Sequence, residues 1–308
     1  MILLTKLLKS LTALALATLL AACGTDSSSS GDASSSSDSG PGFSLRLTDA
    51  AFDDAVSIKL TFARVRLRKI DGGWIDIPVM PSQTVDLMQL QGTKTDELDL
   101  ATKLPPVGDY NELRLVLSGA SMKNTIELSA GGTLELMIPS GSSSGLKVKG
   151  DFSIFEDRPT SLIADIDLRQ SVKMAGPNYI MTPVIRLVEG GNFGHVRGLL
   201  DSALLTDPSC SDAQADTFNA AYVYSGHNVI PDDIDQQSNS DIDPIATTKI
   251  SYDAGSSGYI YEAAFLPAGD YTIAFTCNSD LDDLDADDDL KFFDIQNVTV
   301  KVNNTLFL

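Results

Sequence analysis

The chain has 308 residues, with 22 basic and 42 acidic side chains, two histidines and three cysteines, and is long enough for about two domains. Its net charge of −20 argues against nucleic acid as a partner, because a polyanion would meet like charge without counterion release to drive binding. Two histidines leave little room for a histidine-rich metal site.

Residues 1–22 have the pattern of a signal peptide. Lys6 and Lys9 precede an apolar run at residues 11–20, which is about half of the roughly 20 residues needed to span a bilayer. Leu20-Ala21-Ala22-Cys23 resembles the bacterial lipobox, which implies cleavage before Cys23 and lipid, such as palmitate, on that cysteine. The alternative is an ordinary secretory signal with an incidental cysteine.

Residues 23–42 are expected to be the lipidated cysteine and a disordered linker. Positions 24–42 hold nine serines and no aliphatic residue larger than alanine, so they cannot bury enough surface to offset the entropy of ordering. In lipoprotein sorting, Gly24 after the cysteine is compatible with the outer membrane. We therefore expect a soluble body held by lipid on the bacterial outer membrane, facing the periplasm or the cell surface.

From Phe43 onward, apolar residues alternate with polar ones in short runs separated by Gly, Pro, Asp and Asn. This pattern is typical of antiparallel strands with one buried face. A set of alternate apolar residues runs from Val56 to Phe62, whereas Val65 and Leu67 have the other parity, which predicts a β-bulge near Ala63. No later stretch has a sustained helical period.

The fold class predicted is all-β, with two antiparallel β-sandwich domains of the immunoglobulin or transthyretin type. Glycines at residues 190–191 favour a boundary there, giving domains at 43–189 and 195–308. The charge also changes at this point, because residues 195–308 hold 20 acidic and only 4 basic side chains. Such a change in charge density is typical of two domains rather than one.

A Pro-x-Gly-Asp-Tyr sequence occurs once in each predicted domain, at Pro106–Tyr110 and at Pro267–Tyr271. Proline fixes one turn dihedral and glycine permits a positive φ, so the sequence favours a tight entry into a strand. It resembles the turn of immunoglobulin-like and transthyretin-like sandwiches in which a tyrosine forms a corner. A match of this length also arises by convergence, so it bears on architecture and not on descent.

The order of segments in the first domain resembles a family of bacterial lipoproteins known as domain of unknown function 4382. The resemblance covers about residues 42–189 and implies a β-sandwich in a lipoprotein, without accepted catalytic residues. It lies in the following segments: Ser44–Ala50, Asp53–Ala55, Ile58–Leu67, Gly73-Trp74, Val85–Leu87, Leu104–Leu117, Ile138–Gly141, Ser144–Lys147, Asp165–Arg169 and Pro183–Leu187.

The second domain more weakly resembles carboxypeptidase-regulatory-like or prealbumin-like sandwiches. The likeness lies in Ala221–Tyr224 and in the turn and strand at Leu266–Phe275. Domains of that kind are usually non-catalytic modules. A long acidic insert is the departure from the pattern.

Cys210 and Cys277 remain once Cys23 is assigned to lipid. In an oxidising compartment two cysteines of one domain most simply form a disulfide, and the alternative is two free buried thiols. Their spacing excludes a catalytic Cys-x-x-Cys pair.

Seven aspartates stand in residues 280–289. Alternating carboxylates supply the hard oxygen ligands that suit Ca²⁺, although Asp288 and Asp294 stand where an EF-hand loop requires glycine and glutamate. The alternative is a solvated acidic loop, and approach of a second acidic stretch, Asp232–Asp235 with Asp241 and Asp243, would favour the metal. The candidate ligands are Asp280, Asp282, Asp283, Asp285, Asp287 and Asp289.

Other polar residues admit both a functional and a structural interpretation. Five aspartates include paired carboxylates that could serve glycoside hydrolysis, but their positions are more typical of turn caps and charges on the face of a strand. Trp74 could stack on a sugar ring or pack in a hairpin. The alternating arginines could balance the acid of their domain or contact anionic lipid or polysaccharide. The carboxylates are Asp49, Asp53, Asp54, Asp165 and Asp167, and the arginines are Arg64, Arg66 and Arg68.

We expect a non-enzymatic envelope lipoprotein that acts as a binding or structural module, with an envelope protein or polysaccharide as its partner. A Ca²⁺-dependent adhesion or glycan-binding module is the alternative, and a glycan-acting hydrolase is a third. No cofactor is required by the first of these, and Ca²⁺ is the cofactor of the second.

The disulfide has a direct chemical test. A thiol-reactive mass tag added without reductant should leave the secreted domain unmodified, because both sulfurs of a disulfide are unreactive toward it. Mass spectrometry measures the outcome, and labelling of both Cys210 and Cys277 would contradict the prediction.

Overall fold

The computed structural model describes residues 42–50, 52–210, 218–235 and 242–308. The predicted signal peptide, Cys23 and the serine-rich linker up to residue 41 lie outside the described residues, so they stay predictions. No helix in the described part of the chain is long and apolar enough to cross a membrane.

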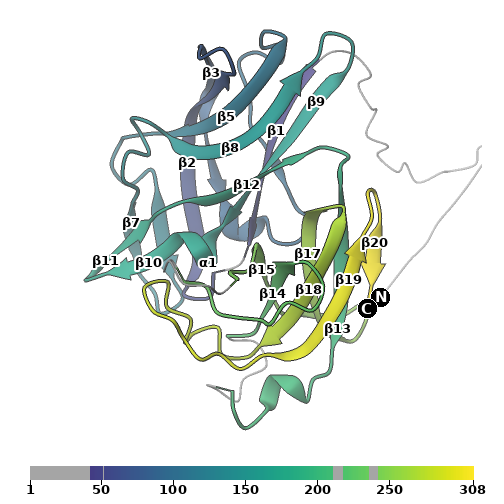
Figure 1. Ribbon diagram of the computed structural model, residues 1–308. Coiled ribbons are helices and arrows are strands. Elements are labelled where there is room, and N and C mark those ends of the chain that lie inside the picture. The colour runs from purple at the N-terminus through teal and green to yellow at the C-terminus, as the bar shows by residue number, and fades with distance from the viewer. Residues whose placement is uncertain (1–41, 51, 211–217, 236–241) are drawn as a thin grey trace, which may run out of the picture. The chain divides into compact units, whose positions relative to one another are not determined.

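Residues 42–189, here the N-terminal half, form two sheets (Figure 1). The two sheets share one apolar core. The four-stranded sheet has the order β12-β9-β1-β4, from β1 (Gly42–Ala50), β4 (Asp96–Glu97), β9 (Pro159–Asp167) and β12 (Val184–Glu189). The eight-stranded sheet has the order β10-β11-β7-β6-β2-β5-β8, with β3 also paired to β2. Its strands are β2 (Ala55–Lys69), β3 (Trp74–Asp86), β5 (Gly108–Leu117), β6 (Thr125–Leu128), β7 (Thr133–Met137), β8 (Leu146–Ile154), β10 (Val172–Ala175) and β11 (Asn178–Met181).

Residues 193–308, here the C-terminal half, form two further four-stranded sheets. One has the order β16-β17-β13-β20, from β13 (Phe193–Leu200), β16 (Ser251–Asp253), β17 (Gly258–Pro267) and β20 (Thr305–Phe307). The other has the order β15-β14-β18-β19, from β14 (Ala220–Ser225), β15 (Ala246–Lys249), β18 (Gly269–Thr276) and β19 (Phe293–Val300).

Helical segments in the described residues are short. They are α1 (Leu168–Ser171) and the 3₁₀ turns η1 (Leu87–Gln89) and η2 (Leu204–Thr206). The all-β prediction is therefore confirmed. Most strand pairs are antiparallel as expected, while β1–β9, β7–β11 and β13–β20 pair in parallel.

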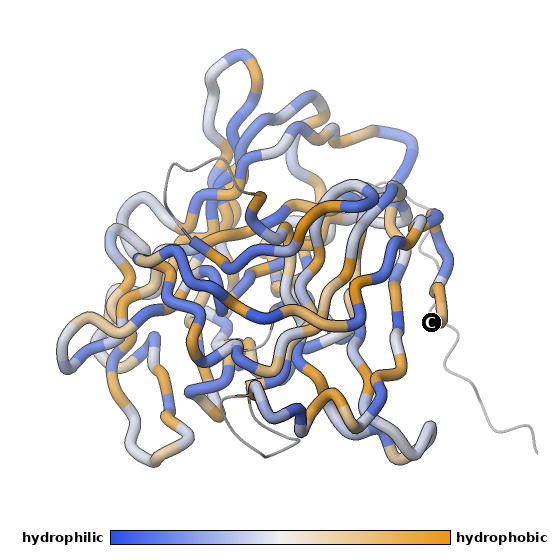
Figure 2. Tube along the Cα trace, turned by 60° about the horizontal axis from the view of Figure 1, so that its bottom comes forward, coloured by the Kyte–Doolittle hydropathy of each residue, from blue (hydrophilic) through white to orange (hydrophobic). Residues whose placement is uncertain are grey.

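Alternation of apolar and polar residues places the cores (Figure 2). Phe43, Leu45 and Leu47 on β1 are at most 1% exposed, and the residues between them are half-buried. Leu113 and Leu115 on β5 face the same core from the opposite sheet. A sandwich follows because each sheet buries its apolar face against the other.

The long strand β2 contains the predicted bulge and a second irregularity. Its register with β3 and β5 shifts between Phe62 and Arg64, as the change of parity predicted. Val56 was expected on the buried face, but it is 53% exposed. The reason is another register shift, between Ala55 and Ser57, which buries Ser57 and turns Val56 outward.

The shared Pro-x-Gly-Asp-Tyr turn has the same hydrogen bond in both halves. The hydroxyl of Tyr110 donates to the carbonyl oxygen of Pro106 at 2.5 Å, and the hydroxyl of Tyr271 donates to that of Pro267 at 2.8 Å. Both rings are buried, and Gly108 has a φ of +140°, which side-chain-bearing residues rarely adopt. The predicted tyrosine corner is therefore present twice.

The sheet built on β14 and β18 is buried on both faces. One face packs against the sheet of β13 and β17, and the other lies under the acidic loops, which we define as residues 226–235 with 242–245, and 277–292. Ile234 and Leu284 from these loops pack on Tyr222 and Tyr224 of β14, and Phe292 joins them. This explains why β14 is almost continuously apolar.

No strand pair joins the two halves in the described part of the chain, yet residues 39–308 form one compact unit. Side chains make the connection. Gln170 in α1 donates to the carbonyl oxygen of Pro244 at 3.1 Å, and Ile163 and Val188 pack against Phe265. The domain boundary at residues 189–195 stays a prediction. The strands on its two sides, β12 and β13, belong to different sheets.

Replacing either corner tyrosine by phenylalanine should lower the free energy of unfolding by about 1 kcal/mol, because a buried side chain loses its hydrogen bond to a backbone carbonyl oxygen. Tyr110→Phe and Tyr271→Phe should be additive, since they lie in separate cores. Urea unfolding measures both, with Tyr252→Phe at a 58% exposed ring as the control. A corner variant as stable as that control would contradict the prediction.

Candidate functional site

The outer face of the eight-stranded sheet carries cationic side chains from neighbouring strands. Val65 and Leu67 on β2 are fully buried, so the arginines between and beside them lie on the opposite side of the sheet. Strand pairing sets Arg66 opposite Arg114 on β5, and Arg114 opposite Lys147 on β8. The cationic face consists of Arg64, Arg66, Arg68, Arg114, Lys147 and Lys149.

Trp74 lies at the edge of this cationic face. It begins β3 directly opposite Arg68, and the guanidinium carbons of Arg114 and Arg66 are 4.5 Å and 4.9 Å from its ring centroid. Such cation–π contacts contribute about 0.5–1 kcal/mol each at exposed sites. The indole, for which the sequence left sugar stacking and hairpin packing open, thus contacts two arginines and holds them in position.

Two carboxylates offset part of the positive charge. Asp76 pairs with Arg66 at 2.7 Å, and Glu112, whose side chain is 9% exposed, pairs with Arg114 at 2.6 Å and Arg68 at 3.6 Å. The lysines of β8 are exposed and form no ion pair with any described residue. A net positive surface therefore remains on a chain whose total charge is −20.

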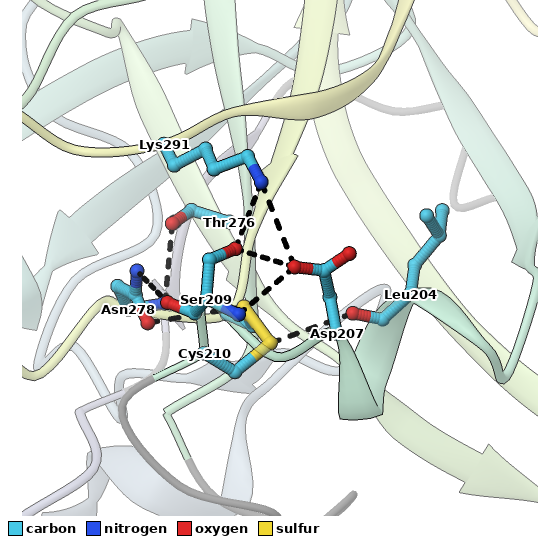
Figure 3. The surroundings of a disulfide bond; sticks show 8 residues. Leu204, Asp207, Ser209, Cys210, Thr276, Asn278 and Lys291 are labelled. Carbon is cyan, nitrogen blue, oxygen red and sulfur yellow. Dashed lines mark hydrogen bonds and ion pairs between the residues drawn. A yellow bond between two sulfur atoms is a disulfide. The ribbon is translucent and has the colours of Figure 1, made fainter.

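The predicted disulfide is present in the C-terminal half (Figure 3). Cys210 and Cys277 are joined with their Cα atoms 5.2 Å apart. Lys291 donates to the Ser209 hydroxyl at 2.9 Å, and the Asn278 side-chain amide donates to the Ser209 carbonyl oxygen at 3.0 Å. Closing a loop of 67 residues contributes about 4 kcal/mol in the chain-entropy model. The bond therefore fixes one end of the second acidic loop to the segment after η2.

The aspartates predicted as Ca²⁺ ligands do not all come together. Asp282 lies close to Asp233 and Asp288, while Asp287 lies close to Asp232 and Asp233. The remaining candidates belong to neither group, and one of them, Asp285, pairs with Lys173 of β10 at 2.6 Å. The remaining candidates are Asp280, Asp283, Asp285 and Asp289. The second acidic stretch does approach the first, although its Asp241 lies outside the described residues.

A buried ion pair lies where the acidic loops meet the N-terminal half. Arg169 of α1 donates to Asp53 at 2.5 Å and to the carbonyl oxygen of Ser279 at 3.1 Å. Burial alone would raise the pKa of Asp53, but the guanidinium outweighs it and the pKa is lowered. Lys249 adds an ion pair to the same carboxylate at 3.7 Å. Asp54 beside it has a raised pKa, because of burial and then the Asp53 charge.

Asp167 caps the short α1 turn. Its carboxylate accepts the Gln170 backbone N–H at 3.0 Å and the Thr247 backbone N–H at 3.3 Å. Burial raises its pKa to about 6. The structural interpretation of this aspartate as a cap is therefore supported by its contacts.

A cavity of about 240 Å³ lies between the halves and gathers several of the other carboxylates. Asp165 on its wall is held by the Arg186 guanidinium, which also donates to the Ala264 carbonyl oxygen at 3.3 Å. Asp49 and Asp167 line the same space, whereas Asp53 and Asp54 line a different one of about 340 Å³. The five aspartates considered for glycoside hydrolysis thus line two separate cavities, three in one and two in the other.

Sequence reasoning found Arg64, Arg66 and Arg68 but missed the rest of the cationic face. The alternation Lys147-Val148-Lys149 on β8 carries a similar signal, with a buried valine between two exposed lysines. Only strand register shows that these lysines belong beside Arg114. The spacing along the chain contains no information on that pairing.

Residues 42–183 match the family described as domain of unknown function DUF4382. This DUF4382 match contains the cationic face, Trp74, Asp53 and Arg169. It ends before the C-terminal half, so the acidic loops lie outside it. No curated protein matches the chain.

Three solved structures show a remote likeness. The Bacillus anthracis TIE protein is 12% identical with a TM-score of 0.19, and the comparison covers 86% of this chain and 33% of TIE. GBS52, the minor pilin of Streptococcus agalactiae, is 10% identical with a TM-score of 0.19, covering 86% and 93%. BcpA, the major pilin subunit of Bacillus cereus, is 12% identical with a TM-score of 0.17, covering 86% and 65%. This chain thus spans about a third of the length of TIE.

The pKa of Asp167 generates a prediction on stability. Its value of about 6 in the folded chain exceeds the ordinary 3.8, so the folded state binds more protons than the unfolded state between these values. The free energy of unfolding contributed by this group should therefore fall by about 1–3 kcal/mol as the pH rises from 4 to 7.

Asp167→Asn should reduce that pH dependence, because asparagine does not titrate. Urea unfolding at several pH values measures the slope, which is the readout even if the variant is less stable throughout. Asp157→Asn at an exposed position is the control. An unchanged slope in Asp167→Asn would show that this group does not titrate in the range.

Proposed function

We propose that this chain is a non-enzymatic binding module of the bacterial envelope that binds an anionic polysaccharide on its cationic face. The observation that carries the proposal is the register of like charges, in which Arg66, Arg114 and Lys147 lie side by side on β2, β5 and β8. Like charges directly opposite each other destabilise a sheet. A bound polyanion would offset that repulsion.

The form of the surface supports a polymer as the ligand. Small-molecule sites are enclosed cavities lined mainly by apolar groups, whereas the cationic face spreads over three strands of a sheet. Its arginines have side chains between 19% and 45% exposed. Guanidinium groups form paired hydrogen bonds to carboxylates, and Trp74 holds two of them in place.

The non-enzymatic part of the proposal is supported by the partners of the acidic residues. Asp53 and Asp165 are paired with arginines, and Asp167 caps a turn. Each contact stabilises the charged or hydrogen-bonded state of a carboxyl group within the fold. These are the roles that the structural interpretation of the sequence predicted.

The location that we propose for the protein rests on the N-terminal sequence alone. Lipid on Cys23 would hold the module at the outer membrane, on the periplasmic or the outer side, where envelope polysaccharides are available. The C-terminal half would then act as a second non-catalytic sandwich of the carboxypeptidase-regulatory-like kind, supported by its corner at Tyr271.

Binding of polygalacturonate to the full chain tests the proposal, with neutral dextran as the matched polymer. The double variant Lys147→Gln/Lys149→Gln should weaken binding at least about fivefold, since two exposed charges leave the face. Affinity should also fall with added salt. Isothermal titration calorimetry measures both effects.

The control is Lys123→Gln/Lys301→Gln, which removes the same charge from exposed positions elsewhere. It should change the affinity by less than about twofold. Equal weakening in both double variants would contradict a site on the cationic face. Binding to phosphatidylglycerol vesicles or to duplex DNA, but not to polygalacturonate, would show that the ligand is not a polysaccharide.

A further inference from the structure

The acidic loops bring three carboxylates together that are far apart in the sequence. Oxygen atoms of Asp233, Asp282 and Asp288 lie within 4.8 Å of one another. Asp233 belongs to the first acidic loop, and the other two belong to the second. We name these three residues the acidic cluster.

The positions of the carboxylates follow from apolar packing beneath them. Ile234 and Leu284 are buried against Tyr222 and Tyr224 of β14, which pins each loop beside one member of the acidic cluster. The Asp288 backbone N–H donates to Asp233 at 2.7 Å, and the Ile234 backbone N–H donates to Asp282 at 3.1 Å. The arrangement is therefore preorganised rather than a chance approach of exposed side chains.

Asp233 is the central member of the acidic cluster. It is 2% exposed, and its Oδ2 accepts the Asp288 N–H. Its Oδ1 is buried with no hydrogen-bond partner among the described residues. A buried carboxylate oxygen without a partner is costly, so its presence beside two further carboxylates points to a ligand that contributes positive charge.

Burial also affects the ionisation of two members of the acidic cluster. Burial, followed by the neighbouring carboxylates of Asp282, Asp232 and Asp235, raises the pKa of Asp233 to about 6. Burial raises the pKa of Asp282 to about 6 as well, against the opposing effects of the Tyr222 hydrogen bond and the Arg169 charge.

We propose that Asp233, Asp282 and Asp288 bind a divalent metal ion, with Ca²⁺ as the ion that their all-oxygen chemistry fits. Ca²⁺ accepts about six to eight oxygen ligands at about 2.3–2.6 Å, so oxygens within 4.8 Å of one another can share one ion. Mg²⁺ requires a stricter octahedral arrangement and binds more weakly to such a site. Water would supply the remaining ligands.

The acidic cluster is connected to the contact between the two halves through Asp282. Asp282 accepts a hydrogen bond from the Tyr222 hydroxyl, and its charge acts on Arg169, which donates to Asp53 and to the Ser279 carbonyl oxygen. The metal site is independent of the cationic face and of its ligand.

Calcium titration of the full chain by isothermal calorimetry tests the proposal. After chelator treatment and its removal, the chain should bind about one Ca²⁺ with a Kd of about 10⁻⁵–10⁻³ M, and more weakly Mg²⁺. Asp233→Asn and Asp288→Asn should each lower the Ca²⁺ affinity at least about tenfold, because each removes one anionic ligand. The melting temperature of the wild type should rise with Ca²⁺.

Asp289→Asn is the matched control, because it removes the same charge from an exposed position in the same loop, outside both carboxylate groups. It should leave the affinity within about twofold. If Asp233→Asn fails to fold, the half-buried Asp288 still provides the test. No saturable binding at about 10 mM Ca²⁺, or equal losses in Asp288→Asn and Asp289→Asn, would overturn the proposal.

Asp287→Asn separates the two carboxylate groups that share Asp233. Its affinity should stay close to that of the wild type. A loss in Asp287→Asn without one in Asp288→Asn would assign the ion to Asp232, Asp233 and Asp287, and the acidic cluster as defined would be wrong.

Discussion

The guanidinium of Arg169 lies where the two halves of the chain meet without a shared strand. It is buried with the Asp53 carboxylate, donates to the Ser279 carbonyl oxygen, and acts electrostatically on Asp282. Breaking a buried ion pair costs about 3–5 kcal/mol, because the remaining charge has no partner. The four-residue α1 turn and its Asp167 cap serve to hold this side chain in position. The contact between the halves, and the environment of the acidic loops, both depend on it.

Positive and negative side chains gather on different parts of this molecule. One of the two proposed sites uses the positive side chains, and the other uses the negative ones. The cationic face is built on the regular strands β2, β5 and β8, where side chains alternate and register aligns them. The acidic cluster is built on loops, where apolar anchors and backbone hydrogen bonds aim the carboxylates. The first surface is broad and exposed, as suits a polymer. The second is narrow and partly buried, as suits a single ion.

The acidic loops also cover the second face of the sheet that contains β14. A sheet of a sandwich normally leaves one face to water, but β14 presents tyrosines on its second face. Ile234 and Leu284 cover these rings, and the tyrosine hydroxyls bond to Asp282 and to the carbonyl oxygen of Asp232. The acidic loops, which hold 11 of the 20 acidic side chains of residues 195–308, are therefore structural covers as well as a candidate metal site.

Local patterns in the sequence determined the all-β class, the bulge between Phe62 and Arg64, the two tyrosine corners and the Cys210–Cys277 bond. The class, the bulge and the corners depend on residues close in sequence. The disulfide depends on a single possible pairing, because only two cysteines remain after Cys23. Tertiary structure alone decided which strands are neighbours, and so placed Lys147 beside Arg114 and Asp233 beside Asp288. It also turned Val56 outward through a register shift that alternation does not reveal. The physical reason is that strand order and loop packing follow from the burial of many distant side chains at once, which local periodicity does not encode.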